Sequence, residues 1–367
     1  MRSLLGLSNS MMNKTQLKIK HHYVPVCYLG GFTEVASKSN CLHVLDLDTM
    51  KSWKDLPKNV ACENDYNSVD GDLPADAFED SFAEIEAATA PIWHRMIETK
   101  TVPTDPEELH WLMNFLTLLL LRTKPSRKLI DDMYLACAQG AIDLVTSTPE
   151  RFESQIKQMQ DAGIDMPELN QGIPLEQIRQ SMRDGSLEMS VENHNNYYLI
   201  KMGEQSVKVL EVLHARNWAI WDFTDTEVNL FTSDDPVSVV WNKPTPQIHP
   251  AGFGLSGTLA IIPLTTNLAL IGAFERELLV TKTSSLLARR VNGVTLGHAF
   301  RFIYSSDDSR KATIANESGD VEVCLDSYLK KRVDSNRHSH QHTNVHRMGS
   351  LIRCAAEKVP NYINLTT

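Results

Sequence analysis

Residues 228–241 read VNLFTSDDPVSVVW, and this stretch decides the class of fold. Two short apolar runs lie on either side of a polar group that ends in Asp234-Asp235-Pro236. Short runs of β-branched and aromatic residues that are separated by Asp, Ser and Pro are typical of strands joined by turns. The same pattern of short apolar runs and turn residues occurs before and after this stretch. We therefore predict a meander of strands that spans about 217–305 and includes residues 218–223, 258–264 and 268–271.

Helices are predicted on the N-terminal side of this sheet. Residues 104–108, TDPEE, offer an N-cap, an early proline and first-turn acids, which favour the start of a helix that ends near Lys124-Pro125. Residues 76–98 have helical spacing, and we expect Pro91 to kink this helix or split it in two. Other expected elements are helices over 126–147, 149–162, 191–215 and 284–299, a short helix after Pro174, two strands within 41–53 and a strand at 300–304.

A block of helices between two groups of strands predicts an α+β fold. The helical central block covers about 76–215, with an N-terminal hairpin before it and a C-terminal antiparallel or mixed sheet after it. We expect a single domain over 21–333. An N-terminal arm over 1–20 and a polar, His-containing tail over 334–367 lie outside it.

Charge weighs against some partners. The chain has 367 residues, with 36 Lys and Arg against 46 Asp and Glu, and a net charge of −10. An acidic chain has no overall attraction for polyanions, which argues against a binding protein for duplex DNA. Contact with nucleic acid would need a local basic patch, and a protein partner is the other expectation. The densest such patch before the tail is Arg122, Lys124, Arg127 and Lys128.

The cysteines and the apolar stretches predict a cytoplasmic protein without a membrane partner. Six cysteines are scattered without a CxxC pair, which is typical of a reducing compartment. The longest apolar stretch, 109–121, contains His, Asn and Thr and is shorter than the ~20 residues of a membrane helix. The first residues contain no signal-peptide cleavage site. No Walker loop, GxGxxG, GxSxG or HExxH motif occurs, which argues against nucleotide-driven motors, Rossmann dehydrogenases, common serine hydrolases and zincins.

Several short segments, in one order along most of the chain, resemble the uncharacterised bacterial family DUF4238. The resemblance implies no particular activity, because none is assigned to the family. The frequent occurrence of its members in mobile or variable genome regions suggests a role in anti-phage defence. The segments that carry it are His22-Tyr23-Val24-Pro25 with Tyr28-Leu29 and Phe32, Val60 through Glu63 to Tyr66, Ile85-Glu86, Arg122-Thr123 to Arg127, Thr232 through Val237, Ile262-Pro263-Leu264, and Asn292 with Ala299.

Three residue types in these segments can support acid-base and phosphate chemistry. His22 precedes Pro25, which favours an extended backbone, and an imidazole there can act as an acid, a base or a ligand, or only hold the N-terminal segment in place. Glu86 on a helix needs a positive partner if it is buried. Arg122 at the end of the leucine-rich helix can pair with Glu86 or, together with Arg127, bind a phosphate. A purely structural Glu–Arg pair is the alternative.

The polar turn and the last helix offer two more candidates. Asp234 can ligate a divalent cation together with Glu86 or Glu63, or activate water, because turns at strand ends often present functional carboxylates. It can equally cap backbone amides within the turn. Asn292, followed by Gly293, is either a ligand contact or part of a helix end. The histidines of 338–346 fit adventitious metal binding in an exposed segment.

Our leading hypothesis from the sequence is a metal-assisted phosphodiester hydrolase that uses Mg²⁺ or Mn²⁺. Its catalytic residues are His22, Glu86 and Asp234, its metal ligands are Glu86 and Asp234, and its substrate contacts are Arg122, Arg127 and Asn292. Phosphoryl chemistry needs such charge-stabilising groups in one place. The alternative is a non-enzymatic sensor, toxin-like or interaction module of a mobile-element or defence system, in which the same residues only join parts of the fold.

Overall fold

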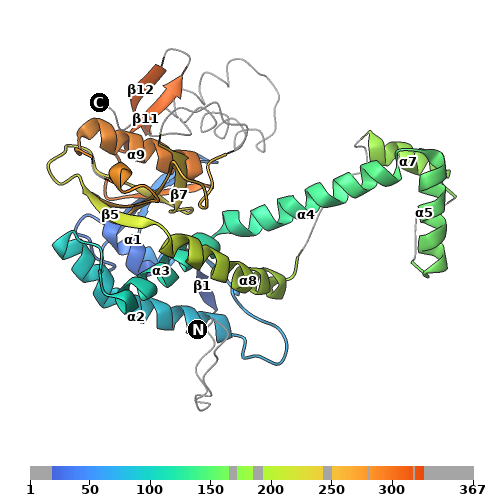
Figure 1. Ribbon diagram of the computed structural model, residues 1–367, viewed down its shortest axis with the longest axis horizontal. Helices are drawn as coiled ribbons and strands as arrows, with labels where there is room; N and C mark the ends of the chain where they lie inside the picture. The colour runs from blue at the N-terminus through green and yellow to red at the C-terminus, as the bar shows by residue number, and fades with distance from the viewer. Residues whose placement is uncertain are drawn as a thin grey trace. The chain divides into compact units, whose positions relative to one another are not determined.

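A computed structural model describes residues 19–164, 172–184, 193–242, 250–279, 281–316 and 319–325 (Figure 1). The contacts within it divide the chain into two compact units. Unit 1 combines the segment up to Ser126 with the segment from Asn195 onward, and unit 2 is Arg127–His194. The single domain over 21–333 stays a prediction, and the helical block expected over about 76–215 contributes to both units. The N-terminal arm and the His-containing tail lie outside the described residues.

The helices α2, α3 and α8 pack together in unit 1. Asp105 caps the helix α3, because its carboxylate accepts hydrogen bonds from the main-chain N–H groups of Glu107 and Glu108, both at 3.0 Å. Pro91 does not divide the preceding helix, which continues through it and ends before Lys100, a residue with a left-handed backbone. The helix α3 packs against both of its neighbours, which are α2 (Ala77–Thr99) and α8 (Asn195–His214); α3 itself is Pro106–Leu121.

The N-terminal hairpin and two late strands form one antiparallel sheet. Its strand order is β3-β2-β10-β6, so β10 pairs with the hairpin strand β2 on one side and with β6 on the other. Ile303 in β10 lies opposite Leu45 and Ser233. Strand β10 therefore joins the N-terminal hairpin to β6 within one sheet. The strands are β2 (Leu42–Asp46), β3 (Ser52–Asp55), β6 (Thr232–Ser233) and β10 (Phe302–Ser305).

The second four-stranded sheet contains part of the expected meander, namely β7, β8 and β9 in order with β5 at the edge next to β9, whereas β6 and β10 belong to the first sheet. Its order is β5-β9-β8-β7, and every pair is antiparallel. Every residue of β8 and β9 is buried, because both faces of these strands are covered. Ile262 and Leu270 pack in the cluster that includes α2 and α3. Ile261 and Ile271 pack in the cluster that includes α9. Its elements are β5 (Asn217–Asp222), β7 (Ser238–Trp241), β8 (Thr258–Pro263) and β9 (Leu268–Ala273), with η3 (Arg276–Leu279) and α9 (Ser285–His298) after them.

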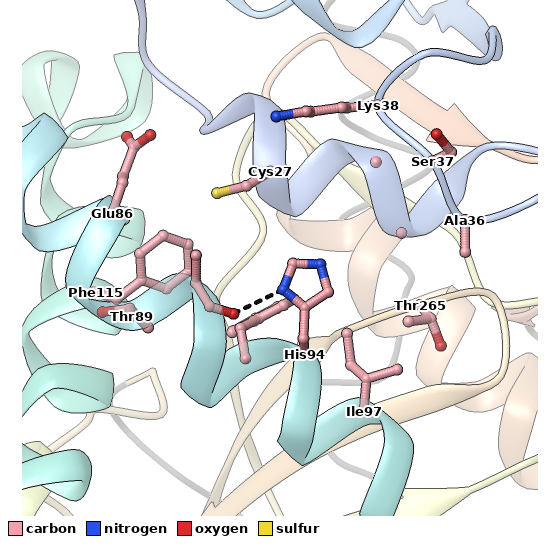
Figure 2. Close-up of a pocket in the computed structure, with 14 residues that line it drawn as sticks. Cys27, Ala36, Ser37, Lys38, Glu86, Thr89, His94, Ile97, Phe115 and Thr265 are labelled. Carbon is pink, nitrogen blue, oxygen red and sulfur yellow. Dashed lines mark hydrogen bonds between the residues drawn. The ribbon is translucent and has the colours of Figure 1, made fainter.

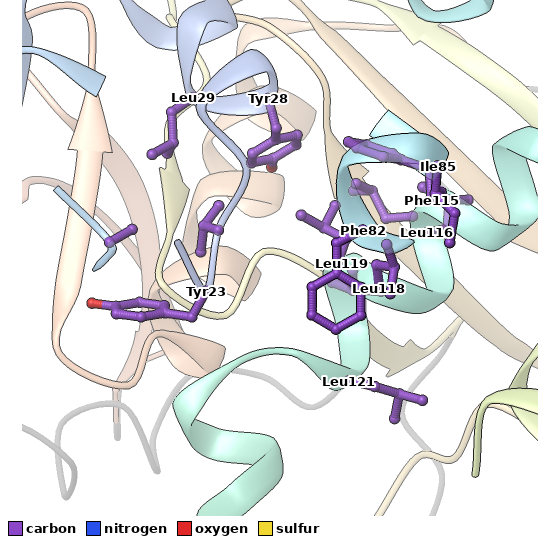
Figure 3. Packing of buried hydrophobic residues seen from close by; sticks show 14 of the residues in the cluster. Tyr23, Tyr28, Leu29, Phe82, Ile85, Phe115, Leu116, Leu118, Leu119 and Leu121 are labelled. Carbon is purple, nitrogen blue, oxygen red and sulfur yellow. The ribbon is translucent and has the colours of Figure 1, made fainter. Parts of the chain in front are cut away.

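The main hydrophobic core joins the N-terminal turn to the helices. Tyr28 and Leu29 lie close to Phe82, Phe115 and other side chains of α2 and α3 in this cluster (Figure 3). This turn is placed by a small two-stranded sheet, β1 with β4. The remaining elements of unit 1 are β1 (Lys20–His22), α1 (Val26–Leu29), η1 (Gly30–Phe32), η2 (Pro57–Asn59), β4 (Cys62–Asn64), β11 (Lys311–Asn316) and β12 (Gly319–Cys324).

Unit 2 is helical and has a small core of its own. Phe152, Ile156 and Ile178 form its buried cluster, and the guanidinium of Arg179 donates a hydrogen bond of 2.8 Å to the carbonyl of Thr146. Its helices are α4 (Lys124–Val145, the first residues of which belong to unit 1), α5 (Pro149–Asp161) and α7 (Leu175–Arg183).

Helices and antiparallel sheets together confirm the predicted α+β class. The helices that were expected over 104–124, 126–147, 149–162 and 191–215 each correspond to an observed helix within a few residues. Within the described ranges, no helix is long and apolar enough to cross a membrane.

Candidate ligand pocket

Two of the predicted site residues form a partly buried ion pair. Arg122 follows the last residue of α3, and its Nη2 donates a hydrogen bond of 2.9 Å to Oε1 of Glu86 on α2. The arginine side chain is only 2% exposed, whereas that of Glu86 is 28% exposed. The guanidinium also lies 5.1 Å from the centre of the Phe82 ring, and its Nε is buried without a hydrogen-bond partner. Burial of a guanidinium needs a carboxylate partner, and Glu86 provides it.

His22 lies in the electrostatic surroundings of this pair. Its Nε2 donates a hydrogen bond of 3.1 Å to the carbonyl of Lys58, because a carbonyl can only accept. Burial lowers the pKa of His22, and the positive charge of Arg122 lowers it further, while the nearby Glu79 and Glu86 act in the opposite direction. Of the predicted site, the structure thus brings His22, Glu86 and Arg122 into mutual electrostatic range.

Asp234 has a structural role in the sheet around β6. It is fully buried, and its carboxylate accepts hydrogen bonds of 2.9–3.1 Å from the main-chain N–H groups of Phe300 and Arg301. Burial outweighs these bonds and raises the pKa of Asp234 to about 6. The amides belong to residues 300 and 301 and not to the turn of Asp234 itself, so this carboxylate holds the segment before β10 against β6, away from solvent.

Asn292 makes its contacts with parts of the fold other than the Glu86–Arg122 pair. The amide of Asn292 is buried in α9, where its nitrogen donates to the carbonyls of Asn229 and Lys311 and its oxygen accepts from the N–H of Phe231. These bonds hold α9 against its neighbours, and Asn292 lies within α9 and not at the helix end that the sequence suggested. Arg127 belongs to α4 in unit 2.

The residues present do not fit the expected Mg²⁺ or Mn²⁺ site. Within the part of the chain that the structure describes, no group of three or more His, Cys, Asp or Glu side chains is arranged to hold a metal ion. Glu86 is paired with Arg122, and the two oxygens of Asp234 are taken by main-chain amides. These contacts give no support to Glu86 and Asp234 as ligands of one metal ion, and that assignment stays a prediction.

Glu86 does, however, line a pocket of about 350 Å³, which we call the α2 pocket. One side of it is a single face of α2, and the other is the turn formed by α1 and η1 with the loop that follows (Figure 2). The residues that line it are Cys27, Gly30, Gly31, Ala36, Ser37, Lys38, Glu86, Thr89, Ala90, Trp93, His94, Ile97, Phe115 and Thr265.

The face of α2 explains why these side chains meet. Positions 86, 89, 90, 93, 94 and 97 follow the i, i+3, i+4 spacing of one helix face. Glu86 and His94 are eight residues apart, which is about 12 Å along the helix axis. Trp93 and Phe115, whose ring centres lie 5.1 Å apart, contribute aromatic surface to the pocket. The pocket is therefore mostly apolar, with a polar group toward each end of this face.

Two further side chains give the pocket its chemistry. Nδ1 of His94 lies 2.8 Å from the carbonyl of Ala90 and donates to it, so in the neutral ring Nε2 is an acceptor. Cys27 is reached by solvent, yet the surrounding protein raises the pKa of its thiol to about 12, with an added contribution from Glu86. A thiol with this pKa stays protonated at neutral pH and is a weak nucleophile.

The opposite side of the pocket depends on two glycines. A Cβ atom at Gly31 would lie 2.5 Å from the carbonyl oxygen of Leu264, and one at Gly30 would lie 3.1 Å from the main-chain nitrogen of Lys38. The turn can approach the strand end and its own loop only because both side chains are absent. Lys38 on this side brings a positive charge to the pocket, opposite the carboxylate of Glu86 (Figure 2).

Sequence reasoning identified Glu86 but missed Cys27, Lys38, Trp93 and His94. The helical spacing from residue 86 to residue 97 was a usable signal for part of the pocket. The opposite side was not visible in the sequence, because it depends on a turn whose contacts with α2 are made across about sixty residues.

The fold and the pocket define an α+β protein with an acidic group inside a largely apolar cavity. The chain belongs to the family described as Protein of unknown function (DUF4238), which matches residues 20–309 and so includes every residue that lines the pocket. No curated protein and no solved structure matches the chain.

Proposed function

We propose that the α2 pocket binds a small zwitterion of the amino-acid type, and that the protein is a ligand-dependent sensor or interaction module. The observation that carries this proposal is the position of Glu86. One of its oxygens is held by the buried Arg122, and its other oxygen has no hydrogen bond to any described residue. A carboxylate in this position favours a cationic or hydrogen-bond-donating group in the pocket.

The remaining lining defines the rest of the ligand. Lys38 faces the pocket from the other side and suits a carboxylate. Trp93, Phe115 and Ile97 offer apolar and aromatic surface for a hydrophobic side chain. Nε2 of His94 adds an acceptor for one further donor of the ligand. An amino acid with an apolar side chain has each of these features.

Calorimetry with a matched set of compounds tests the proposal. The set is phenylalanine, phenethylamine, which lacks the carboxylate, and N-acetylphenylalanine, which lacks the cation, with the leucine series in parallel. We expect the free amino acid to bind most tightly. Glu86→Gln should weaken the compounds with an ammonium group, and Lys38→Met those with a carboxylate.

Glu84→Gln is the matched control, because Glu84 lies exposed on the same helix and does not line the pocket. Equal affinities for wild type and Glu86→Gln, or no binding by any compound of the set, would refute the proposal. Wild type should also gain thermal stability with ligand concentration as mass action requires.

Phosphodiester hydrolysis is a second proposal, which rests on the convergence of His22, Glu86 and Arg122. A neutral His22 can accept a proton near neutral pH, and the Nε–H of Arg122, which is buried without a partner, would donate to a phosphate oxygen once the substrate displaces the side chains that cover it. Asp234 has no part in this version. We propose no step through a metal ion, since the described residues do not form a ligand set.

Labelled RNA and DNA, with Mg²⁺, with Mn²⁺ or with a chelator, test this second proposal. Cleavage by wild type that is lost in both His22→Gln and Arg122→Met supports it. Equal cleavage by wild type and His22→Gln, or none by wild type, excludes it.

A cytoplasmic location and a role in anti-phage defence complete the proposal. They rest on the scattered cysteines and on the family's genomic setting, and phage plating with and without the gene tests the role in defence.

A further inference from the structure

The helix α4 carries an apolar stripe that its own unit leaves exposed. Leu129, Met133 and Leu144 are 70%, 53% and 62% exposed, and Cys137 is exposed as well. At 100° per residue these positions fall within an arc of about 100°. We call this set the α4 stripe; with the two small residues among them it consists of Leu129, Met133, Ala136, Cys137, Gly140 and Leu144.

Another face of α4 already has neighbours. Ile130 is buried, and Val145 packs against the cluster that α5 and α7 form. Around the helix axis, Leu129 and Ala136 lie at least a quarter turn from both of these residues, whereas Cys137 and Leu144 lie about 20° and 40° from Ile130. The stripe therefore borders the buried face of α4 on its Cys137 side, and its exposed side chains extend over about four helical turns.

The stripe is complementary to itself when a second copy runs in the opposite direction. With the two-fold axis between residues 136 and 137, Leu129 lies level with Leu144 of the copy. Met133 then lies level with Gly140 of the copy, so that the long side chain meets the residue without one. Cys137 lies level with Ala136 of the copy and close to the axis. Large residues meet large residues at the ends, and large meets small in between, as close packing requires.

The charges beside the stripe obey the same symmetry. Lys128, Asp132, Gln139 and Asp143 lie along one edge of it and are paired within the helix, Lys128 with Asp132 at 2.6 Å and Gln139 with Asp143 at 2.8 Å. In an antiparallel pair with two-fold symmetry this edge faces the same edge of the copy. Measured along the helix axis, Lys128 then lies within about 3 Å of the level of Asp143 of the copy. Asp132 lies within the same distance of the level of Gln139 of the copy. Each contact occurs twice.

We propose that α4 mediates an antiparallel homodimer of this chain through the α4 stripe. The occupant is a second copy because both the side-chain sizes and the charges repeat correctly under a two-fold axis. A parallel pair would not place Leu129 opposite Leu144 or Lys128 opposite Asp143. The interface is short and lies at the low end of stable interface sizes, at most roughly 1,000 Å² in total, so the dimer dissociates on dilution.

Sedimentation velocity of the full chain across a concentration series is the first test. We expect a monomer–dimer equilibrium for wild type and a monomer at every concentration for Leu129→Glu. Lys128→Asp should weaken the dimer about ten-fold, because two opposite-charge contacts become repulsive. Lys128→Asp combined with Asp143→Lys should restore it. Lys157→Asp, an exposed charge reversal on α5, should leave it unchanged.

Cross-linking then fixes the direction of the helices. In a Cys137→Ser background, a chain with Leu129→Cys is mixed with a chain that carries Leu144→Cys, and mild oxidation should produce the mixed dimer. Wild type should cross-link through Cys137, and Cys137→Ser alone should not.

Three results would overturn the proposal. They are a monomeric wild type at all concentrations, a dimer that Leu129→Glu does not affect, and failure of the double charge exchange to restore association. Because the substitutions lie on an exposed face, circular dichroism should show unchanged helix content in each variant.

Discussion

Glu86 and Arg122 make unequal contributions to stability. Glu86→Gln leaves a guanidinium that is 2% exposed without its carboxylate, and we expect it to cost roughly 1–3 kcal/mol of unfolding free energy, less than a fully buried pair because Glu86 is partly exposed. Arg122→Met removes the buried charge and keeps much of the volume, so it should cost less. Urea denaturation measures both, with Glu84→Gln as the control. A larger cost for Arg122→Met than for Glu86→Gln would contradict this account.

Asp234 makes the stability of the fold depend on pH. Its pKa is raised to about 6 in the folded state, above the roughly 3.9 of an unfolded chain. The folded state therefore binds the proton more tightly, and the stability gained from this carboxyl is present below about pH 4 and lost as the pH rises through about 6. The change amounts to at most about 3 kcal/mol.

Wild type compared with Asp234→Asn in urea, at intervals from pH 4 to pH 7.5, isolates this contribution. The stability of wild type relative to the variant should fall between pH 4 and pH 6 and then become constant. A difference that stays constant across this range would contradict the raised pKa. Asp235, whose pKa is also raised by burial and then by Asp234, should titrate at lower pH in the variant.

Residue type alone predicted the contacts of only some of the candidate site residues. Glu86 and Arg122 were predicted to pair, and the structure confirms that contact. Asp234 and Asn292 were equally credible as ligands or as structural caps, because a carboxylate or amide beside a turn serves both purposes. The outcome depended on burial and on main-chain donors about 65 residues away, which the local sequence does not contain.

At the scale of elements, the turn at Gly30 and Gly31 should be sensitive to a single methyl group. Gly31→Ala places Cβ against a main-chain oxygen at 2.5 Å, and overpacking of this kind costs roughly 1–3 kcal/mol. Gly30→Ala, with its nearest atom at 3.1 Å, should cost less. Thermal and urea unfolding compare the two variants, and an equal or larger cost for Gly30→Ala would show that the close approach to Leu264 is not the cause.

The helices were predictable because their signals are local. Asp105-Pro106 begins α3 as expected, since an N-cap and a proline act within one turn. Pro91 was expected to divide α2 or kink it, but tertiary packing of residues on both sides, Ile85 and Trp93 among them, keeps the helix continuous. The pairing of β2 with β10 could not be read from the sequence, because nothing near residue 44 specifies a partner near residue 304.

At the scale of the whole molecule, the two units should differ in their resistance to local opening. Unit 2 has a buried cluster of three residues among those described, whereas the main cluster of unit 1 extends from the N-terminal turn through α2 and α3 to β9. Opening is easier where few apolar contacts must break. Hydrogen exchange followed by mass spectrometry should therefore show faster exchange in α5 and α7 than in α3 or β8. Equal protection of α5 and α3 would contradict this.

During synthesis, β2 can pair with β10 only after the ribosome has made the residues of β10. About 256 residues separate Asp46 from Phe302, its partner in the register. At ribosomal rates of roughly 5–20 residues per second, the edge of β2 waits about 13–50 s for the strand that completes it. Until then the nascent hairpin presents unpaired main-chain groups to neighbouring chains on the same polysome. The open edge of β2, Leu42–Asp46, is the part that a ribosome-associated chaperone would have to shield, because β3 remains an edge strand in the finished sheet as well.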